Sequence, residues 1–190
     1  VLSKLNTLVK DVDAGMQEYK VTESSRAIQD FTDELSNWYV RRCRERFWQQ
    51  GMSDDKIAAY MTLYTALVTI AKTAAPMIPF MAEDIYRNLV CKVDKAAPVS
   101  IHLCDFPTAD ESMIDKSLEE NMEEVVDVVV LGRACRNGAA IKNRQPLSKM
   151  YVAADFTLPA FFTEIIEEEL NLKAVEFKSD ISTFISYTFK

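Results

Sequence analysis

The sequence predicts a mainly α-helical fold, a bundle of about five helices followed by a small C-terminal β-α-β-β appendage. Up to residue 148, apolar residues recur at three- and four-residue steps, which is the spacing of one face of a helix. Glycine and proline are sparse, at four and six in 190 residues. Beyond that point, short runs rich in β-branched and aromatic residues indicate strands. We therefore predict a helical domain at 1–148 and a small α/β appendage at 149–190.

Two long helices are predicted in the first fifty residues. The first covers residues 1 to about 18, with an apolar stripe formed by Leu2, Leu5, Val9, Val12 and Met16. The second runs from about residue 23 to 48, with Thr22 as its N-cap and Gly51 just beyond its end. Its buried stripe is expected to be Phe31, Leu35, Tyr39, Cys43 and Phe47.

Three more helices are predicted before the appendage. Ser53 begins one with Asp54 and Asp55 in its first turn, where the helix dipole favours acids, and Pro76 ends it. Its core stripe is expected to be Ile57, Tyr60, Met61, Tyr64, Leu67, Val68 and Ala71. Pro79 suits the first turn of the next helix, which continues to about residue 90. The last helix runs from about residue 115 to 141.

The remaining segments are predicted to be irregular or extended. Residues 91–113 are expected to lack regular structure, apart from a short strand or extended arm at 99–103. In the appendage, strands are predicted at 150–153, 174–178 and 184–189, with a helix at 158–170 between the first two.

Composition limits the class of protein. A content of 48% hydrophobic, 10% aromatic and 27% charged residues excludes collagen and wholesale disorder. No uninterrupted apolar run of 18 residues and no signal-peptide pattern is present, so we expect no membrane partner. Because the chain starts at Val1 rather than Met, we expect it to be a piece of a longer protein.

Residues that carry catalysis or bind metals are scarce. The four cysteines form no C-x-x-C pair, and His102 is the one histidine, so we expect no metal site and four unpaired, buried thiols in a reducing cytoplasm. The sequence has no glycine-rich phosphate loop, no G-x-S-x-G elbow and no ready Ser-His-Asp set. We therefore expect this segment to be non-catalytic and to hold no cofactor.

Positive charge is concentrated in two short segments of an acidic chain. The net charge is −7, yet the first basic segment (residues 37–48, NWYVRRCRERFW) carries +3 and the second basic segment (residues 132–149, GRACRNGAAIKNRQPLSK) carries +5. The remainder therefore carries −15, and residues 110–127 contribute eight acids against one lysine. The distribution predicts a strongly polarised surface.

Each basic segment has a nucleic-acid interpretation and a simpler alternative. In the first, a helical projection places Asn37, Arg41, Arg44 and Trp48 opposite the core stripe, where amide, guanidinium and indole groups suit bases and phosphates. The alternative is an ordinary solvated helix face. In the second, the acid-free loop before Lys149 suits a phosphate clamp. The alternative is a helix C-terminus with cations placed for the dipole.

Four stretches of the sequence resemble isoleucyl-tRNA synthetases. They are DELSNWYVRRCRERFW at 33–48, APMIPFMAEDIY at 75–86, SIHLCDFP at 100–107 and GRACRNGAAIKNRQPLSK at 132–149. They are similar, in the same order, to the anticodon-binding domain of that class I family, downstream of its catalytic core. The P-F-x-x-E-x-Y element also occurs in valyl, leucyl and methionyl relatives, whereas the first and last stretches are more specific to the isoleucine enzyme.

The resemblance implies a helical bundle of the class I anticodon-binding type that holds the anticodon stem-loop of isoleucine tRNA. The parent enzyme would be cytoplasmic and would couple isoleucine activation by ATP, with Mg, to tRNA charging on a domain absent here. The family's H-x-G-H and K-M-S-K-S signatures are missing from this chain. Expected partners are the tRNA and the other domains of the synthetase. The candidate tRNA-binding residues are Asn37, Arg41, Arg44, Trp48, Arg136, Lys142, Arg144 and Lys149.

Two alternatives remain open from the sequence. The chain could be the anticodon domain of a related valyl, leucyl or methionyl enzyme. It could instead be a helical protein-interaction scaffold whose partner surface is the acidic run 110–127. The scaffold hypothesis predicts no RNA binding and basic segments that are neutralised by salt bridges.

Overall fold

The computed structural model describes residues 1–182 and confirms a mainly helical fold, with 65% helix, seven α-helices in this range and a two-stranded parallel sheet. The chain divides into two compact units, Val1–Asp115 and Lys116–Lys190. Each unit is described by itself below. The division at residue 148 stays a prediction about domain organisation.

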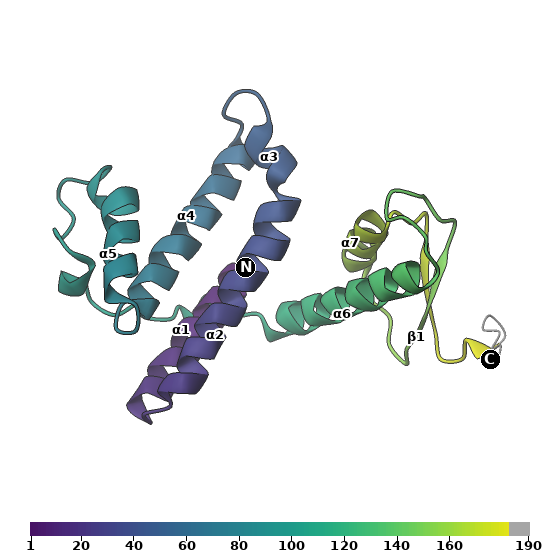
Figure 1. Ribbon diagram of the computed structural model, residues 1–190, viewed down its shortest axis with the longest axis horizontal. Helices are drawn as coiled ribbons and strands as arrows, with labels where there is room; N and C mark the ends of the chain where they lie inside the picture. The colour runs from purple at the N-terminus through teal and green to yellow at the C-terminus, as the bar shows by residue number, and fades with distance from the viewer. Residues whose placement is uncertain (183–190) are drawn as a thin grey trace. The chain divides into compact units, whose positions relative to one another are not determined.

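The first unit is built around two helices that lie side by side, α1 (Leu2–Gln17) and α2 (Val21–Glu34) (Figure 1). Their facing apolar residues form a core with residues of a later helix, and its buried members are Leu5, Leu8, Val12, Ile28, Phe31, Leu35, Ala66 and Ala74. The predicted α1 stripe is confirmed. The predicted cap at Thr22 is wrong, because α2 begins at Val21 and its N-cap position is Lys20, without a side-chain bond.

The long second helix expected from the sequence is interrupted. After α2 the chain passes through a π-helical stretch (Leu35–Val40) and a turn at Cys43 before α3 (Arg44–Trp48). A π-helix accommodates more residues per turn than an α-helix and often marks a functional region. The first basic segment therefore starts within the π-helical stretch and ends with α3. Gly51 lies just after α3 with φ +75°, which suits glycine.

The next helix, α4 (Asp54–Ala74), begins as predicted but buries a different face. The Ser53 hydroxyl accepts a hydrogen bond from the Lys56 amide at 3.2 Å, and the two acids follow in the first turn. The buried residues of α4 are small: Ala59, Ala66, Ala71, Thr73 and Ala74. The core stripe expected from the sequence is wrong at its N-terminal end, where Ile57, Tyr60 and Met61 are 41%, 43% and 55% exposed. Alanines take up little space in the core, while Leu63, Leu67 and Ile70 are partly buried against it.

α4 is also the one helix among the described residues whose length and hydropathy would let it cross a membrane. That test rests on length and composition only. In the structure α4 contacts α1, α2, α3 and α5, and 28% of its 18-residue apolar window is buried.

α5 (Pro79–Tyr86) continues into a π-helical turn (Arg87–Cys91) and organises the segment after it. One carboxylate oxygen of Glu83 accepts hydrogen bonds from the Ser100 hydroxyl at 2.8 Å and from the Ile101 amide at 2.9 Å. These bonds lower the pKa of Glu83. The backbone at Ile101–Leu103 forms a 3-10 turn with Ser100 as its N-cap, so the strand predicted at 99–103 is wrong. A second 3-10 turn spans Glu111–Met113.

The second unit is a long helix next to a strand–helix–strand motif. α6 (Lys116–Gly138) packs on α7 (Ala160–Leu170), and α7 connects β1 (Met150–Ala153) to β2 (Val175–Lys178) (Figure 1). The strands pair in parallel, with Met150 opposite Val175. These elements confirm the first three of the appendage. The strand predicted at 184–189 lies outside the described residues.

Candidate nucleic-acid interface

In the first basic segment, all four sequence-predicted residues are exposed. The structure brings them together in two pairs. Arg41 Nε donates to the backbone oxygen of Asn37 at 2.8 Å, and Arg44 lies 5.4 Å from the ring centroid of Trp48. The Trp48 side chain is 76% exposed.

Cation–π contacts hold guanidinium groups of this segment in place. Besides the Arg44–Trp48 pair, the Arg41 guanidinium lies 5.8 Å from the ring centroid of Trp38, a half-buried residue. Such contacts are favourable even at exposed sites and restrict the arginine side chains before any ligand binds. The result is an indole with most of its surface in solvent and a cation against it, which is the chemistry used to stack an unpaired base.

Arg46 has a structural role that the sequence did not reveal. It forms a two-pronged ion pair with Asp55, with Nε to Oδ2 at 2.8 Å and Nη2 to Oδ1 at 2.7 Å, and it also donates to the Asp55 backbone oxygen. This hydrogen-bonded pair raises the pKa of Arg46 and lowers that of Asp55. The pair joins α3 to α4, and Phe47 packs on Tyr60 beside it with ring centroids 5.0 Å apart. A helix-starting acid such as Asp55 was the available signal, but its partner depends on the tertiary turn.

In the second basic segment, Arg136 is buried at 4% exposure, unlike the other predicted residues. Its Nη1 atom donates to the backbone oxygens of Lys142 and Gln145, both at 3.0 Å. Its Nη2 atom donates to the backbone oxygen of Leu170 at 2.5 Å and, more weakly, to that of Asn171 at 3.4 Å. The guanidinium is thus engaged inside the unit, where it joins the end of α6 to the loop and to the end of α7.

Two further cations of this segment are paired with acids of the same unit. Arg133 Nη2 lies 2.5 Å from an oxygen of Glu169, whose side chain is 5% exposed. Lys149 pairs with Glu176, which raises the pKa of Lys149 and lowers that of Glu176. Lys149 also lies 5.8 Å from the ring centroid of Tyr151. These cations are partly neutralised by their partners.

Lys142 and Arg144 are different. Both are exposed, and no hydrogen bond or ion pair engages either side chain among residues 1–182. The backbone oxygens of both residues are engaged, by Arg136 and by the Asn171 side chain respectively. Their charges are therefore available to a ligand.

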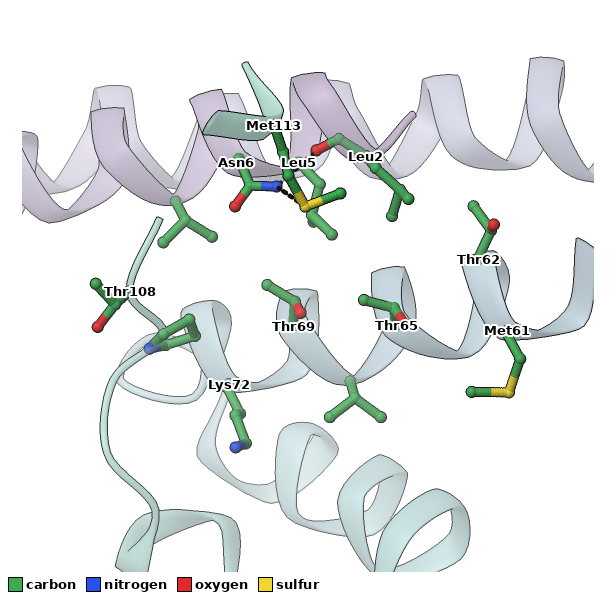
Figure 2. Close-up of a pocket in the computed structure, with 13 residues that line it drawn as sticks. Leu2, Leu5, Asn6, Met61, Thr62, Thr65, Thr69, Lys72, Thr108 and Met113 are labelled. Atoms are coloured by element: carbon green, nitrogen blue, oxygen red, sulfur yellow. Dashed lines mark hydrogen bonds between the residues drawn. The ribbon is translucent and has the colours of Figure 1, made fainter. Parts of the chain in front are cut away.

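A solvent-open groove of about 490 Å³ lies between α1 and α4 in the first unit. Figure 2 shows Thr62, Thr65 and Thr69 along α4, facing Leu2, Leu5 and Asn6 of α1, with Met113 nearby, while the Lys72 side chain points away from α1. Among the described residues that line the groove, Lys72 is the titratable one. A groove lined this way offers no general acid–base pair or nucleophile–base pair.

The cysteines are free, but the expectation that all four are buried is wrong. Cys43 is buried, Cys91 and Cys104 are intermediate, and Cys135 is exposed on α6. The Cys104 thiol contacts the Tyr86 hydroxyl at 3.3 Å, and burial together with this contact raises the pKa of Tyr86. Over the described part of the chain, no group of three or more histidine, cysteine or acidic side chains is placed to hold a metal ion.

Comparison with known proteins identifies the family of the chain. The family model described as the anticodon-binding domain of tRNA ligase matches residues 1–151, a range that includes both basic segments. The chain belongs to this family. The anticodon-binding family match ends inside β1, so it covers the helical bundle, all of α6 and the loop that carries Lys142 and Arg144.

Several isoleucine–tRNA ligases match this chain over its whole length. The chain is 54% identical to an isoleucine–tRNA ligase of Clostridium novyi (strain NT) and 52% identical to one of Clostridium acetobutylicum, each over the full 190 residues. It is 41% identical to isoleucine–tRNA ligase 2 of Bacillus cereus, also over the whole chain. In each case the chain spans 18% of the length of the relative.

Proposed function

We propose that this chain is the part of an isoleucine–tRNA ligase that binds the anticodon stem-loop of isoleucine tRNA. The observation that carries the proposal is the 54% identity with an isoleucine–tRNA ligase over the full chain, within a family defined by anticodon binding. Charging of the tRNA, and with it ATP and Mg, would belong to the rest of that ligase. The same proposal implies the other domains of the synthetase as partners and a cytoplasmic location.

The first basic segment is the part we assign to the anticodon loop. The loop of a tRNA presents unpaired bases, and proteins hold such bases by stacking on aromatic rings and by hydrogen bonds to base edges. Trp48 supplies an exposed ring backed by Arg44, and Asn37 and Arg41 supply an exposed amide and guanidinium on the same segment. The net charge of −7 does not oppose binding, because charges beyond about 8–10 Å are screened at physiological salt.

A binding titration tests the proposal. An isoleucine tRNA transcript and an anticodon-swapped version would be titrated with the 190-residue chain at two salt concentrations. We expect the native anticodon to bind more tightly, and we expect Trp48→Ala to cost about 1–3 kcal/mol, the usual contribution of one aromatic–base stack. Arg41→Ala should reduce the preference for the native anticodon as well.

Arg26→Ala provides the matched control, because Arg26 is an exposed arginine of α2 outside both basic segments. It removes the same charge as Arg41→Ala and should leave the anticodon preference unchanged. Equal affinity for both transcripts, with no effect of Trp48→Ala, would contradict anticodon recognition by this surface.

A second candidate function is a helical interaction scaffold. The ion pairs Arg46–Asp55, Arg133–Glu169 and Lys149–Glu176 favour it, because a scaffold would use its basic segments as internal counter-charges. Lys142 and Arg144 do not fit that description. A folded chain that binds neither transcript at low salt would favour the scaffold.

A further inference from the structure

The loop after α6 is held in place by a buried cation, Arg136. Arg136 donates two hydrogen bonds from one nitrogen to the backbone oxygens of Lys142 and Gln145, the first and last residues of a four-residue turn. A guanidinium remains protonated in proteins, so it carries a full positive charge at this position. Its four acceptors among residues 1–182 are neutral backbone oxygens, which do not cancel that charge.

The backbone of the turn is engaged on its inner side. The Gln145 amide donates to the Lys142 oxygen at 2.9 Å, which closes the turn. The Asn171 side-chain amide donates to the Arg144 oxygen at 2.9 Å, and the Asn171 backbone oxygen accepts from the Leu147 amide at 3.1 Å. Because inner contacts take up three of the four carbonyls of this turn, it has a defined conformation while the side chains of Lys142 and Arg144 remain in solvent.

The turn lies in a stretch of the sequence that carries cations and no acids. The sequence has no acid between Asp127 and Asp155, and one acid of α7 and the acid of β2 pair with the flanking cations. Glu169 pairs with Arg133 before the turn, and Glu176 pairs with Lys149 after it. The turn therefore carries two exposed cations, Lys142 and Arg144, and its backbone is bound by a third, buried cation, Arg136.

We propose that the turn at residues 142–145 binds RNA phosphates through Lys142 and Arg144, and that Arg136 is a positioning residue rather than an RNA ligand. The proposal rests on the proposed function, because it takes the RNA to be the tRNA. An arginine fork matches phosphate oxygens with two hydrogen bonds, and a lysine acts as a mobile point charge beside it. Phosphate contacts of this kind set the position of the protein on the RNA without reading its sequence.

The salt dependence of binding tests the phosphate contact. Lys142→Ala/Arg144→Ala is compared with the charge-matched control Arg26→Ala/Lys92→Ala, which removes an exposed arginine and an exposed lysine of the first unit. Each lost phosphate contact lowers the slope of log K against log salt by about 0.7–0.9. We expect the magnitude of the slope to fall by roughly 1.4–1.8 in the turn variant, and its affinity at 0.15 M salt to fall roughly tenfold, equally for native and swapped anticodons. The control should retain the wild-type slope.

A double-mutant cycle tests the role of Arg136. Arg136→Lys keeps the charge but lacks the planar fork that reaches several carbonyls, so the turn should loosen and tRNA affinity should fall by roughly threefold to tenfold. In the Lys142→Ala/Arg144→Ala background the same change should have almost no further effect on RNA binding, because the positioned side chains are already gone. A residue that contacts RNA by itself would instead give additive losses. Faster hydrogen exchange at Gln145 and Leu147 in Arg136→Lys would report the loosened turn directly.

The outcomes separate this inference from the proposed function. If wild-type chain binds tRNA and the turn variant binds with the same slope, the phosphate site is wrong and the anticodon proposal stands. If Arg136→Lys and the turn variant are additive, Arg136 is a ligand and the positioning role is wrong. If the wild-type chain binds no tRNA, both proposals fail.

Discussion

The two basic segments each use an arginine to hold their own conformation, but they use it against different acceptors. In the first, Arg46 is half-exposed and grips the carboxylate of Asp55 across the α3–α4 turn. In the second, Arg136 is buried and, among residues 1–182, binds only backbone oxygens. The first contact joins two ionised groups near water, whereas the second places a permanent charge among neutral carbonyls in the interior of its unit.

This difference shows why a count of charges overestimates the available binding surface. Of the nine cations in the two segments, Arg46, Arg133 and Lys149 are paired with acids and Arg136 is buried. The side chains that remain suited to a ligand are fewer and lie at particular places. They include Arg41 and Arg44, each against a tryptophan ring, in the first segment, and Lys142 and Arg144 on the turn of the second.

The largest expected effect comes from removing the buried arginine. Arg136→Met deletes the donors to four backbone oxygens, one of them in a buried hydrogen bond and three in part-buried ones, and we expect the free energy of unfolding of the second unit to fall by roughly 3 kcal/mol or more. Urea unfolding and hydrogen exchange of the α6 amides would measure it. Arg46→Met is the paired variant and should cost only a small fraction of this, because its ion pair is solvated. Similar losses for both variants would break the distinction between the two segments.

A smaller effect is expected at Gly132, the first residue of the second basic segment, which lies against Leu170 of α7. A methyl group on Gly132 would lie 2.4 Å from Cδ1 of Leu170, a side chain that is 1% exposed and cannot easily move. We expect Gly132→Ala to destabilise the second unit by about 1–2 kcal/mol, the overpacking cost less the helix gain of alanine. Gly138→Ala, in the same helix with no atom within 4 Å of the added methyl, should be neutral or slightly stabilising. Equal stability of the two variants in thermal unfolding would show that α6 and α7 separate at little cost.

Local signals in the sequence predicted much of the fold. Ser53 is followed by two acids, and it caps α4 as expected. The stretches at 75–86 and 100–107, which carried the family resemblance, turn out to be physically connected. Glu83 of the first accepts hydrogen bonds from Ser100 and Ile101 of the second, and the Tyr86 hydroxyl donates to the Pro98 oxygen. A motif in this case records a tertiary contact, although the sequence alone did not show which residues meet.

The failures arise where tertiary packing decides between faces. Helical periodicity favoured the large residues of α4 as its core, but the fully buried positions are mostly alanines, and Ile57, Tyr60 and Met61 are exposed. The exposed face of Asn37, Arg41, Arg44 and Trp48 was predicted correctly even though a π-helical stretch interrupts the helix. The sequence did not distinguish Arg136 from Arg144, because two acceptors of Arg136, the backbone oxygens of Leu170 and Asn171, lie 34 and 35 residues further along the chain.

The smallest expected effect is a difference in how the stabilising contacts of the two basic segments respond to low pH. Arg46 holds the pKa of Asp55 below its ordinary value of 3.8, so the pair contributes fully to stability above that pH and loses its contribution as the pH falls through the lower pKa of the folded state. The Arg136 contacts have no carboxylate to protonate and should persist. The stability difference between wild type and Asp55→Asn should therefore shrink from pH 6 to about pH 2.5 in thermal unfolding. Taking this difference cancels Glu176, whose pKa is lowered in the same direction by Lys149 and which is present in both proteins. Asp54→Asn removes an equal charge one residue away without breaking the ion pair, so it should not reproduce the effect. If the stability difference between wild type and Asp55→Asn is the same at both pH values, the contribution of Arg46 to stability does not depend on an ionised Asp55.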